Sequence, residues 1–415
     1  MKTIIFLAVL ASATSVFAQT SLTSEFKTLI TRSKIGKVAD QSYCFIKDNT
    51  LQGYQPAKIQ RIASVTKVIS TLLASETLDL HMKFRTKVFV GKDSIHIEGG
   101  KDPYFEEDKV MLLMKGLNDL GIKSVKKVTF TPDFHFNDLP MEQYEKVTPE
   151  RTRARLAAYL SGNTTFLKAT WKGIRNFAAE ENVLLDELAP VLTAESVTIS
   201  AENPLLNENP AIYVHDSLPF HELLKSMNVQ SKNYVAENVY LLGSAIKPLG
   251  AVLTERGIDP KSYLIYTGSG LPVISGQNRV DNLASCATIL KVVGALSESL
   301  KKHNLKLSDV MAVNGGKDRG SFKERFKDYP ETHEAVISKT GTLKQTSTLA
   351  GVLLAGNEMP FAILNHTTNA AGARKFQDRF VARMFDYLGP ATPMDYIKIS
   401  IFPWDGSDFL KSEVK

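Results

Sequence analysis

Residues 62–73 read Ile-Ala-Ser-Val-Thr-Lys-Val-Ile-Ser-Thr-Leu-Leu. The apolar side chains at 65, 68, 69, 72 and 73 recur at helical spacing, so the stretch predicts a buried helix that begins at Ser64. A serine and a lysine three residues apart lie on one face of a helix, and the amine of Lys67 can therefore reach the hydroxyl of Ser64. An apolar helix also desolvates that amine and lowers its pKa, as a base for a hydroxyl proton requires.

The Ser-x-x-Lys pattern is weak evidence by itself because it recurs along the chain. It occurs at Ser24, Ser64, Ser124, Ser244, Ser299 and Ser412. Of these serines, Ser64 alone opens a long apolar helical pattern, so its setting selects it.

A second short motif, Ser231-Lys232-Asn233, lies in a break between two helical patterns. Side chains in such a break can point into a cleft. The same Ser-x-Asn pattern occurs at Ser161 and Ser226, and the setting favours Ser231.

A third motif, Lys339-Thr340-Gly341-Thr342, occurs once, between predicted strands at 335–338 and 349–354. A strand at the edge of a cleft can pair with a substrate backbone by strand addition. The lysine and threonine side chains can bind a terminal carboxylate, and Gly341 lets the substrate approach closely. The three motifs in this order are typical of β-lactamases and penicillin-binding proteins.

Several longer segments resemble the D-alanyl-D-alanine carboxypeptidase/endopeptidase family of low-molecular-mass penicillin-binding proteins. They are residues 223–227, 231–238 (Ser-Lys-Asn-Tyr-Val-Ala-Glu-Asn), 267–271 (Thr-Gly-Ser-Gly-Leu), 320–326 (Gly-Ser-Phe-Lys-Glu-Arg-Phe) and 100–103 (Gly-Lys-Asp-Pro). The resemblance covers residues of roughly 20–110 and 215–390 well, and the middle poorly.

The resemblance implies catalytic and substrate-binding roles for the motif residues. Ser64 would attack the carbonyl of a D-Ala-D-X bond, with Lys67 as the base. Ser231 and Asn233 would relay protons and bind the substrate amide. The substrate carboxylate would be held by Lys339, Thr340 and Thr342, next to Gly341. The backbone N–H groups of Ser64 and Thr342 would form the oxyanion hole, and water would deacylate the enzyme.

Helical patterns before the third motif and antiparallel strands after it predict an α+β fold, and the resemblance implies the same class. It implies a penicillin-binding transpeptidase/β-lactamase-like core, an antiparallel sheet flanked by helices, with an inserted smaller α/β accessory domain. We expect the catalytic domain at 19–82 and 215–415 and the inserted domain at 83–214. A chain of 415 residues suits two domains.

Two departures from the family pattern bear on specificity. The insertion between Lys67 and Ser231 is shorter than the usual two-domain insertion, so we expect a single accessory domain. The acidic side-chain pocket residue of many members is not found. Arg325 remains as a candidate substrate-binding residue, and we expect its side chain to be exposed.

The N-terminus predicts export. Lys2 precedes an apolar run of roughly ten residues from Ile4 to Ala13, and Val16-Phe17-Ala18 presents small residues for cleavage. Residues 1–18 are therefore a predicted signal peptide, and the mature protein is expected to be periplasmic or secreted. The run is too short to span a bilayer, so we expect no stable membrane anchor.

Composition limits the possible partners. The net charge of +6 is scattered, with no arginine-rich stripe, so we expect no nucleic-acid binding. Neither the cysteines nor the scattered histidines have metal-ligand spacing, which predicts no metal and no cofactor. An oxidising compartment permits a Cys44–Cys286 disulfide, but we favour two unpaired buried cysteines.

The sequence therefore predicts a serine DD-peptidase that acts on peptidoglycan and is acylated by β-lactams. A β-lactamase-like hydrolase is one alternative, but no acidic base for deacylation is visible after the Ser64 helix. A non-catalytic penicillin-binding scaffold or sensor is another, and the complete motif set argues against it. The preference between carboxypeptidase and endopeptidase activity and the oligomeric state are left open.

Overall fold

The computed structural model describes residues 22–138, 141–318 and 320–413. The predicted signal peptide at 1–18 lies outside them. Contacts divide the chain into two compact units, one of Met1–Leu78 with Met227–Lys398 and one of Asp79–Ser226 with Ile399–Lys415. We describe each unit by itself.

The first unit is built on a six-stranded sheet in which all neighbouring strands are antiparallel. Its strands, in spatial order, are β13 (Ala312–Val313), β14 (Val336–Leu343), β15 (Thr346–Ala355), β16 (Asn357–His366), β1 (Gln41–Lys47) and β2 (Thr50–Tyr54). The near-continuous buried runs of β15 and β1 follow from a sheet that is covered on both faces.

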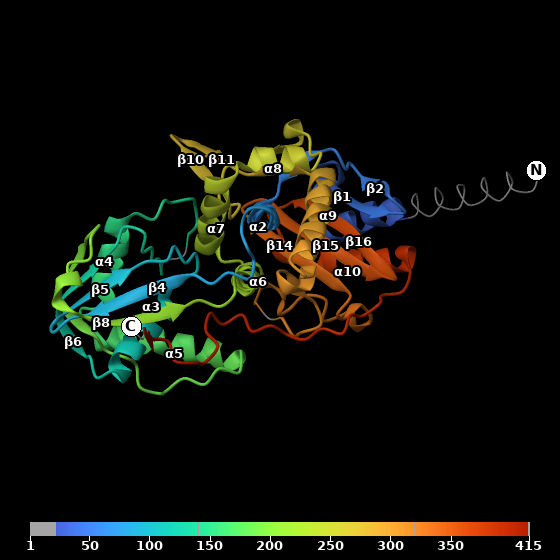
Figure 1. Ribbon diagram of the computed structural model, residues 1–415. Coiled ribbons are helices and arrows are strands. Elements are labelled where there is room, and N and C mark those ends of the chain that lie inside the picture. Colours follow the sequence, from blue (N-terminus) through green and yellow to red (C-terminus); the bar gives the residue numbers. More distant parts are fainter. Residues whose placement is uncertain (1–21, 139–140, 319, 414–415) are drawn as a thin grey trace, which may run out of the picture. The chain divides into compact units, whose positions relative to one another are not determined.

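Helices α9 (Cys286–Lys302) and α10 (Ala370–Leu388) cover opposite faces of this sheet (Figure 1). Successive residues of a strand point to opposite faces. On β1, the ring of Tyr43 packs edge-on against Phe380 of α10, whereas the next residue, Cys44, bonds to Cys286 at the start of α9. The core of this unit is thus a helix–sheet–helix sandwich.

Further helices and small sheets complete the unit around α9. They are α2 (Thr66–Thr77), α6 (Phe220–Gln230, which begins in the other unit), α7 (Asn233–Ile246), α8 (Leu249–Glu255), a three-stranded sheet of β3 (Ile59–Arg61), β12 (Leu283–Ser285) and β9 (Tyr263–Leu264), and a hairpin of β10 (Val273–Ser275) and β11 (Asn278–Val280). Helix α2 is buried along most of its length, as its apolar spacing predicts.

The second unit has a mixed six-stranded sheet of its own. Its strands, in spatial order, are β17 (Lys411–Ser412), β8 (Ala211–Asp216), β4 (Arg85–Val90), β5 (Ser94–Glu98), β6 (Ser124–Phe130) and β7 (Thr193–Ile199). The pairs β5–β6 and β6–β7 are parallel, and helices α3 (Glu107–Asp119), α4 (Pro149–Tyr159) and α5 (Thr164–Glu180) supply the crossovers between them.

The two units together give the α+β architecture that the sequence predicts, an antiparallel core with an α/β insertion. The contact division begins the insertion at Asp79 rather than at 83, and it departs from the predicted boundaries at two further places. The insertion extends to Ser226, and residues 399–415 group with it rather than with the catalytic domain. The reason for the last difference is that β17 pairs with β8, and Phe402 and Phe409 join the hydrophobic core of the insertion.

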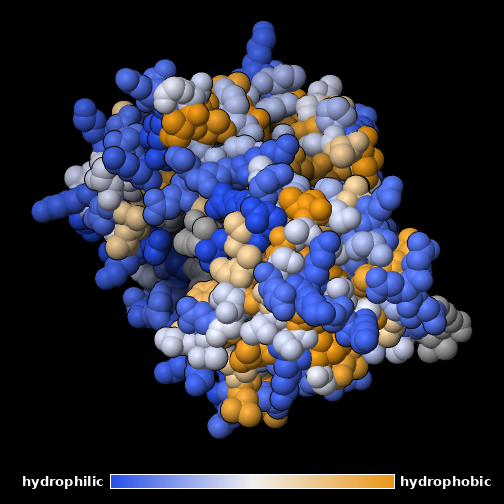
Figure 2. Space-filling view, turned by 90° about the vertical axis from the view of Figure 1, so that its left-hand side faces the viewer, coloured by the Kyte–Doolittle hydropathy of each residue, from blue (hydrophilic) through white to orange (hydrophobic). Residues whose placement is uncertain are grey.

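In the part of the chain that the structure describes, none of the helices combines the length and the apolar character that crossing a bilayer requires. The face in Figure 2 is mainly hydrophilic, and its hydrophobic residues form small separate patches. Scattered apolar residues of this kind are ordinary on protein surfaces.

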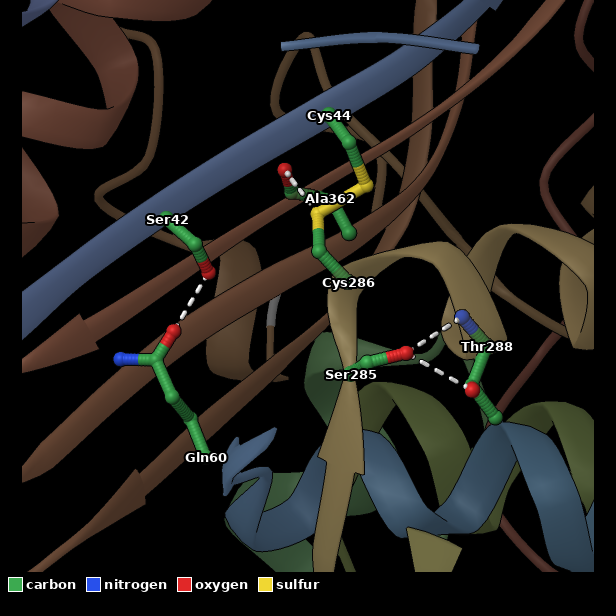
Figure 3. Close-up of a disulfide and its surroundings, with 7 residues drawn as sticks. All are labelled: Ser42, Cys44, Gln60, Ser285, Cys286, Thr288 and Ala362. Carbon is green, nitrogen blue, oxygen red and sulfur yellow. Dashed lines mark hydrogen bonds between the residues drawn. A yellow bond between two sulfur atoms is a disulfide. The ribbon is translucent and has the colours of Figure 1, made fainter. Parts of the chain in front are cut away.

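Cys44 and Cys286 form a disulfide, so the preference for unpaired cysteines was wrong (Figure 3). Their Cα atoms lie 6.0 Å apart although 242 residues separate them in the sequence. Strand β1 runs beside the start of α9, where the hydroxyl of Ser285 accepts a hydrogen bond from the backbone N–H of Thr288 and caps the helix. This proximity depends on the folded core, and cysteine spacing carries no trace of it.

We expect the Cys44→Ala/Cys286→Ala double variant to be destabilised by about 2–4 kcal/mol, because the bond closes a long loop in the unfolded chain. A lower melting temperature by circular dichroism would show the loss. Labelling by a fluorescent penicillin serves as the control and should persist, since neither sulfur contacts a motif residue. Two free thiols in the unreduced wild-type protein would contradict the disulfide.

Candidate active site

Ser64 lies where the chain turns into the buried helix. It is the middle residue of a short 3-10 helix, Ala63–Val65, and α2 follows at Thr66. Ala63 has a φ of 48°, in the left-handed region that residues with a Cβ rarely adopt. The strained residue directly before Ser64 fixes the direction in which the serine leaves the preceding segment.

The Lys67 side chain is completely buried, and its amine has three partners. The Nζ atom donates to Ser64 Oγ at 3.1 Å, to Asn233 Oδ1 at 2.8 Å and to the Ser269 carbonyl at 2.9 Å. Burial lowers the pKa of Lys67 to about 7, against an opposing effect of the Glu237 charge. A large fraction of the amine is therefore neutral near pH 7 and can accept the serine proton.

A second buried lysine, Lys339, lies on β14. Its Nζ donates to Ser231 Oγ at 3.0 Å and to the Thr340 carbonyl at 2.8 Å. Burial lowers the pKa of Lys339 well below its ordinary value, and the charge of Lys67 lowers it further. The hydrogen bonds from Lys67 to Asn233 and from Lys339 to Ser231 bring the three motifs together.

The break between α6 and α7 presents the second motif. Ser231 has a φ of 60°, which ends α6, and Asn233 begins α7. Ser231 therefore points its hydroxyl to Lys339, while Asn233 points its amide oxygen to Lys67. The change of direction at Ser231 thus lets the two side chains of this motif reach two different lysines.

The third motif lies on a strand edge that is partly free. Strand β13 pairs with β14 at Ile337 and Ser338, and none of the described strands pairs with that edge further along. Gly341 also packs closely against the segment that carries Ser64. A Cβ there would meet the Ile62 carbonyl at 2.8 Å and the Ser64 nitrogen at 3.1 Å. The absence of a side chain at 341 thus lets β14 lie close to the segment that carries Ser64.

Thr342, the exposed last residue of this motif, contacts a residue that the sequence analysis did not find. Its Oγ1 atom accepts a hydrogen bond of 3.3 Å from Arg374 Nη2, on α10. Both side chains are exposed. The two donors together form a polar, positively charged end to the free edge of β14.

Arg325 does not have the exposed position that the sequence analysis expects. It is 6% exposed, and its guanidinium donates to Asp378 Oδ1 at 2.7 Å and to Gln377 Oε1 at 3.2 Å. The other Asp378 oxygen accepts from the backbone N–H of Phe326. Arg325 therefore fastens its own segment to α10, and it has no contact with a motif residue.

Glu237 and Ser269 belong to the site although no role is predicted for either. The Glu237 carboxylate binds the turn at 267–270, and the Ser269 carbonyl of that turn binds Lys67. Glu237 could have been found, because it follows Asn233 by four residues on one helix face. The Ser269 carbonyl and Arg374 could not have been found in this way, because no sequence pattern marks either of them.

The site consists of Ser64 hydrogen-bonded to the buried Lys67, together with Asn233, Ser231 and Lys339. This combination of residues is typical of the active-serine enzymes that bind penicillin. The sequence profile of the D-Ala-D-Ala carboxypeptidase 3 (S13) family matches residues 175–385. The chain belongs to this family, whose members are serine DD-peptidases. No curated protein sequence matches it.

Solved structures agree with this assignment. Bd3459, a predatory peptidoglycan endopeptidase from Bdellovibrio bacteriovorus, shares 25% identity, covers 89% of this chain and 98% of its own, and superposes with a TM-score of 0.77. Its penicillin G-acylated form, in complex with immunity protein Bd3460, has the same identity and coverage and a TM-score of 0.75. Penicillin binding protein 4 from Haemophilus influenzae shares the fold at 16% identity, 87% and 99% coverage and a TM-score of 0.55.

Lys67→Arg should lower the rate of acylation by a fluorescent penicillin by about 10²–10⁴-fold, because arginine keeps the charge and cannot accept the proton. The rate is measured by gel fluorescence over time. Lys375→Arg, the same change at an exposed lysine of α10, is the matched control and should acylate normally. Near-normal acylation of Lys67→Arg would exclude Lys67 as the base.

Proposed function

We propose that this protein hydrolyses D-Ala-D-X bonds of peptidoglycan stem peptides, both at pentapeptide ends and in cross-links, through an acyl-enzyme on Ser64. The observation that carries the proposal is the position of the Lys67 amine, within hydrogen-bond distance of both Ser64 Oγ and Asn233 Oδ1. A buried amine with a pKa near 7 at a serine hydroxyl is the arrangement that acyl transfer requires.

In the proposed acylation step, Ser64 Oγ attacks the D-Ala carbonyl carbon while its proton moves to Lys67 Nζ. The backbone N–H groups of Ser64 and Thr342 stabilise the oxyanion that forms on the carbonyl oxygen. The C–N bond then breaks, and the proton taken up by Lys67 passes by way of Ser231, whose hydroxyl is bound to Lys339, to the leaving amine. Water attacks the ester in the second half-reaction, which restores Ser64.

The carboxylate of the leaving residue is the second recognition element in this proposal. Thr340 and Thr342 would bind it at the free edge of β14. Arg374, which donates to Thr342 Oγ1, extends the site with a guanidinium that can bind a carboxylate oxygen. Substrates that lack this carboxylate should therefore bind weakly.

Cleavage of cross-links rests on the size of the insertion. The described residues of the second unit form a single six-stranded sheet, whereas the family resemblance implies two accessory domains at this point. Fewer accessory domains leave more room for a bulky, cross-linked strand and fewer charged contacts that discriminate at the third stem residue. The similarity to Bd3459, a peptidoglycan endopeptidase, supports this part of the proposal.

Export completes the proposal, with the mature protein in the periplasm or outside the cell. Disulfides form in oxidising compartments and are rare in the cytosol. The buried Cys44–Cys286 bond therefore supports the interpretation of residues 1–18 as a cleaved signal peptide.

Digestion of purified peptidoglycan tests the activity. We expect release of D-Ala from pentapeptide monomers and loss of dimeric muropeptides in the same digest, followed by mass spectrometry. Ser64→Ala is the control and should leave both unchanged, because it removes the nucleophile. Cleavage of monomers alone would contradict the endopeptidase part, and cleavage by Ser64→Ala would move the nucleophile elsewhere.

Arg374→Ala should raise KM for a D-Ala-D-Ala peptide roughly tenfold, with a smaller change in kcat, because a charged hydrogen bond to the carboxylate is lost. For the same peptide with an amidated C-terminus, the wild type and the variant should have similar KM values. Lys375→Ala removes an adjacent exposed positive charge and should behave like the wild type. An equal loss on both peptides would show that Arg374 does not bind the carboxylate.

A further inference from the structure

Glu237 is a buried carboxylate one helical turn beyond Asn233. Both residues lie on α7 and, four positions apart, share a face of that helix. Asn233 contacts Lys67 directly, whereas the Glu237 side chain, 4% exposed, reaches a turn that lies against Lys67. Burial of a carboxylate is energetically unfavourable unless its oxygens accept hydrogen bonds. The hydrogen-bond partners of Glu237 therefore indicate its structural role.

Among the described residues, the hydrogen-bond partners of this carboxylate all belong to the turn at 267–270. Oε2 accepts from the Gly268 backbone N–H at 2.9 Å, and Oε1 accepts from the Ser269 backbone N–H at 2.9 Å. The Ser269 hydroxyl also donates to Oε1. Two adjacent backbone N–H groups bound by one carboxylate fix the orientation of the peptide units that follow them.

The orientation matters because the Ser269 carbonyl is an acceptor for Lys67. The Lys67 Nζ–Ser269 O distance is 2.9 Å. One turn further along α2, Ser70 donates to the Gly268 carbonyl at 2.7 Å. Gly270 has a φ of 86°, and a Cβ there would meet the Ala63 carbonyl at 2.0 Å. The turn is thus wedged between α7, α2 and the residue before the nucleophile.

Two charged side chains act on the Lys67 amine from the elements packed around it. Glu237, on α7, favours its protonated form, and Lys339, on β14, is repelled by it. The turn itself carries no titratable side chain, and Asn233 contributes a neutral amide. Glu237 is therefore the charge that offsets part of the desolvation of Lys67.

We propose that Glu237 is a positioning residue for the acyl-transfer reaction: it orients the turn at 267–270 so that the Ser269 carbonyl holds Lys67 Nζ at Ser64 Oγ. Its charge also sets the pH above which that amine becomes a base. The inference rests on the proposed function, since it assigns Lys67 as the base of acylation. In this proposal, Glu237 joins the residues of the three motifs as a polar residue that acts through Lys67 and not on the substrate itself.

The pH dependence of acylation by a fluorescent penicillin tests the proposal with Glu237→Gln. Glutamine keeps the shape, removes the charge and places an N–H₂ group opposite a backbone donor. The acylation rate should fall about tenfold or more. The acid limb, where activity rises as Lys67 loses its proton, should move to lower pH by about half a unit to one unit, because the protonated amine loses a favourable charge.

Two variants separate positioning from a general loss of structure. Ser70→Ala loosens the same turn without changing a charge, so its rate should fall and its acid limb should stay in place. Glu237→Asp keeps the charge on a shorter side chain. Its acylation rate should therefore also fall, and its acid limb should stay at the wild-type pH. If Glu237→Gln fails to fold, as judged by thermal melting, a displaced limb in Glu237→Asp would by itself overturn the proposal.

An acid limb in Glu237→Gln that stays at the wild-type pH, or moves to higher pH, would also overturn it. Failure of the acylation step on Ser64, on which the proposed function depends, gives a different result. In that case the wild-type protein is not acylated at any pH, and the comparison of limbs does not arise.

Discussion

The structure depends on the burial of two amines, Lys67 and Lys339, within one site. A desolvated ammonium is unfavourable, and two of them repel, so the fold must supply acceptors and lower the proton affinity of both groups. Asn233, Ser231 and two backbone carbonyls provide the acceptors. Asn233 lies on α7 and Ser231 in the break between α6 and α7. The two carbonyls belong to the turn at 267–270 and to β14. The need to bring these elements within hydrogen-bond distance explains the strained Ala63 and the two closely packed glycines, Gly270 and Gly341.

Much of this arrangement could be predicted from the sequence because the motifs combine local patterns with local settings. The apolar spacing after Ser64 gave a buried helix, and burial is what lowers the pKa of Lys67. The break around Ser231 and the strands around Lys339 likewise correspond to a helix boundary and to a hairpin strand. The α+β class followed from the same periodicities. In each case the information lay within about ten residues of the position concerned.

What could not be predicted depends on contacts between distant residues. The Cys44–Cys286 bond needs the placement of β1 beside the start of α9, and the burial of Arg325 needs α10 to bring Asp378 over its segment. Arg374 meets Thr342 for the same reason. The tail at 399–415 joins the insertion through strand pairing that its short apolar pattern does not reveal. The Ser269 carbonyl is beyond sequence reasoning altogether, because every residue has one.

The most direct test of this account is the ionisation of Lys67 itself in the folded, uninhibited protein. Selective ¹³C labelling of lysine side chains and an NMR titration, with Lys67→Arg to assign the resonance, would give its pKa. The account predicts a titration near pH 7, far below that of the exposed lysines. A resonance that titrates with the exposed lysines, near pH 10, would mean that the amine stays protonated and cannot be the base for Ser64.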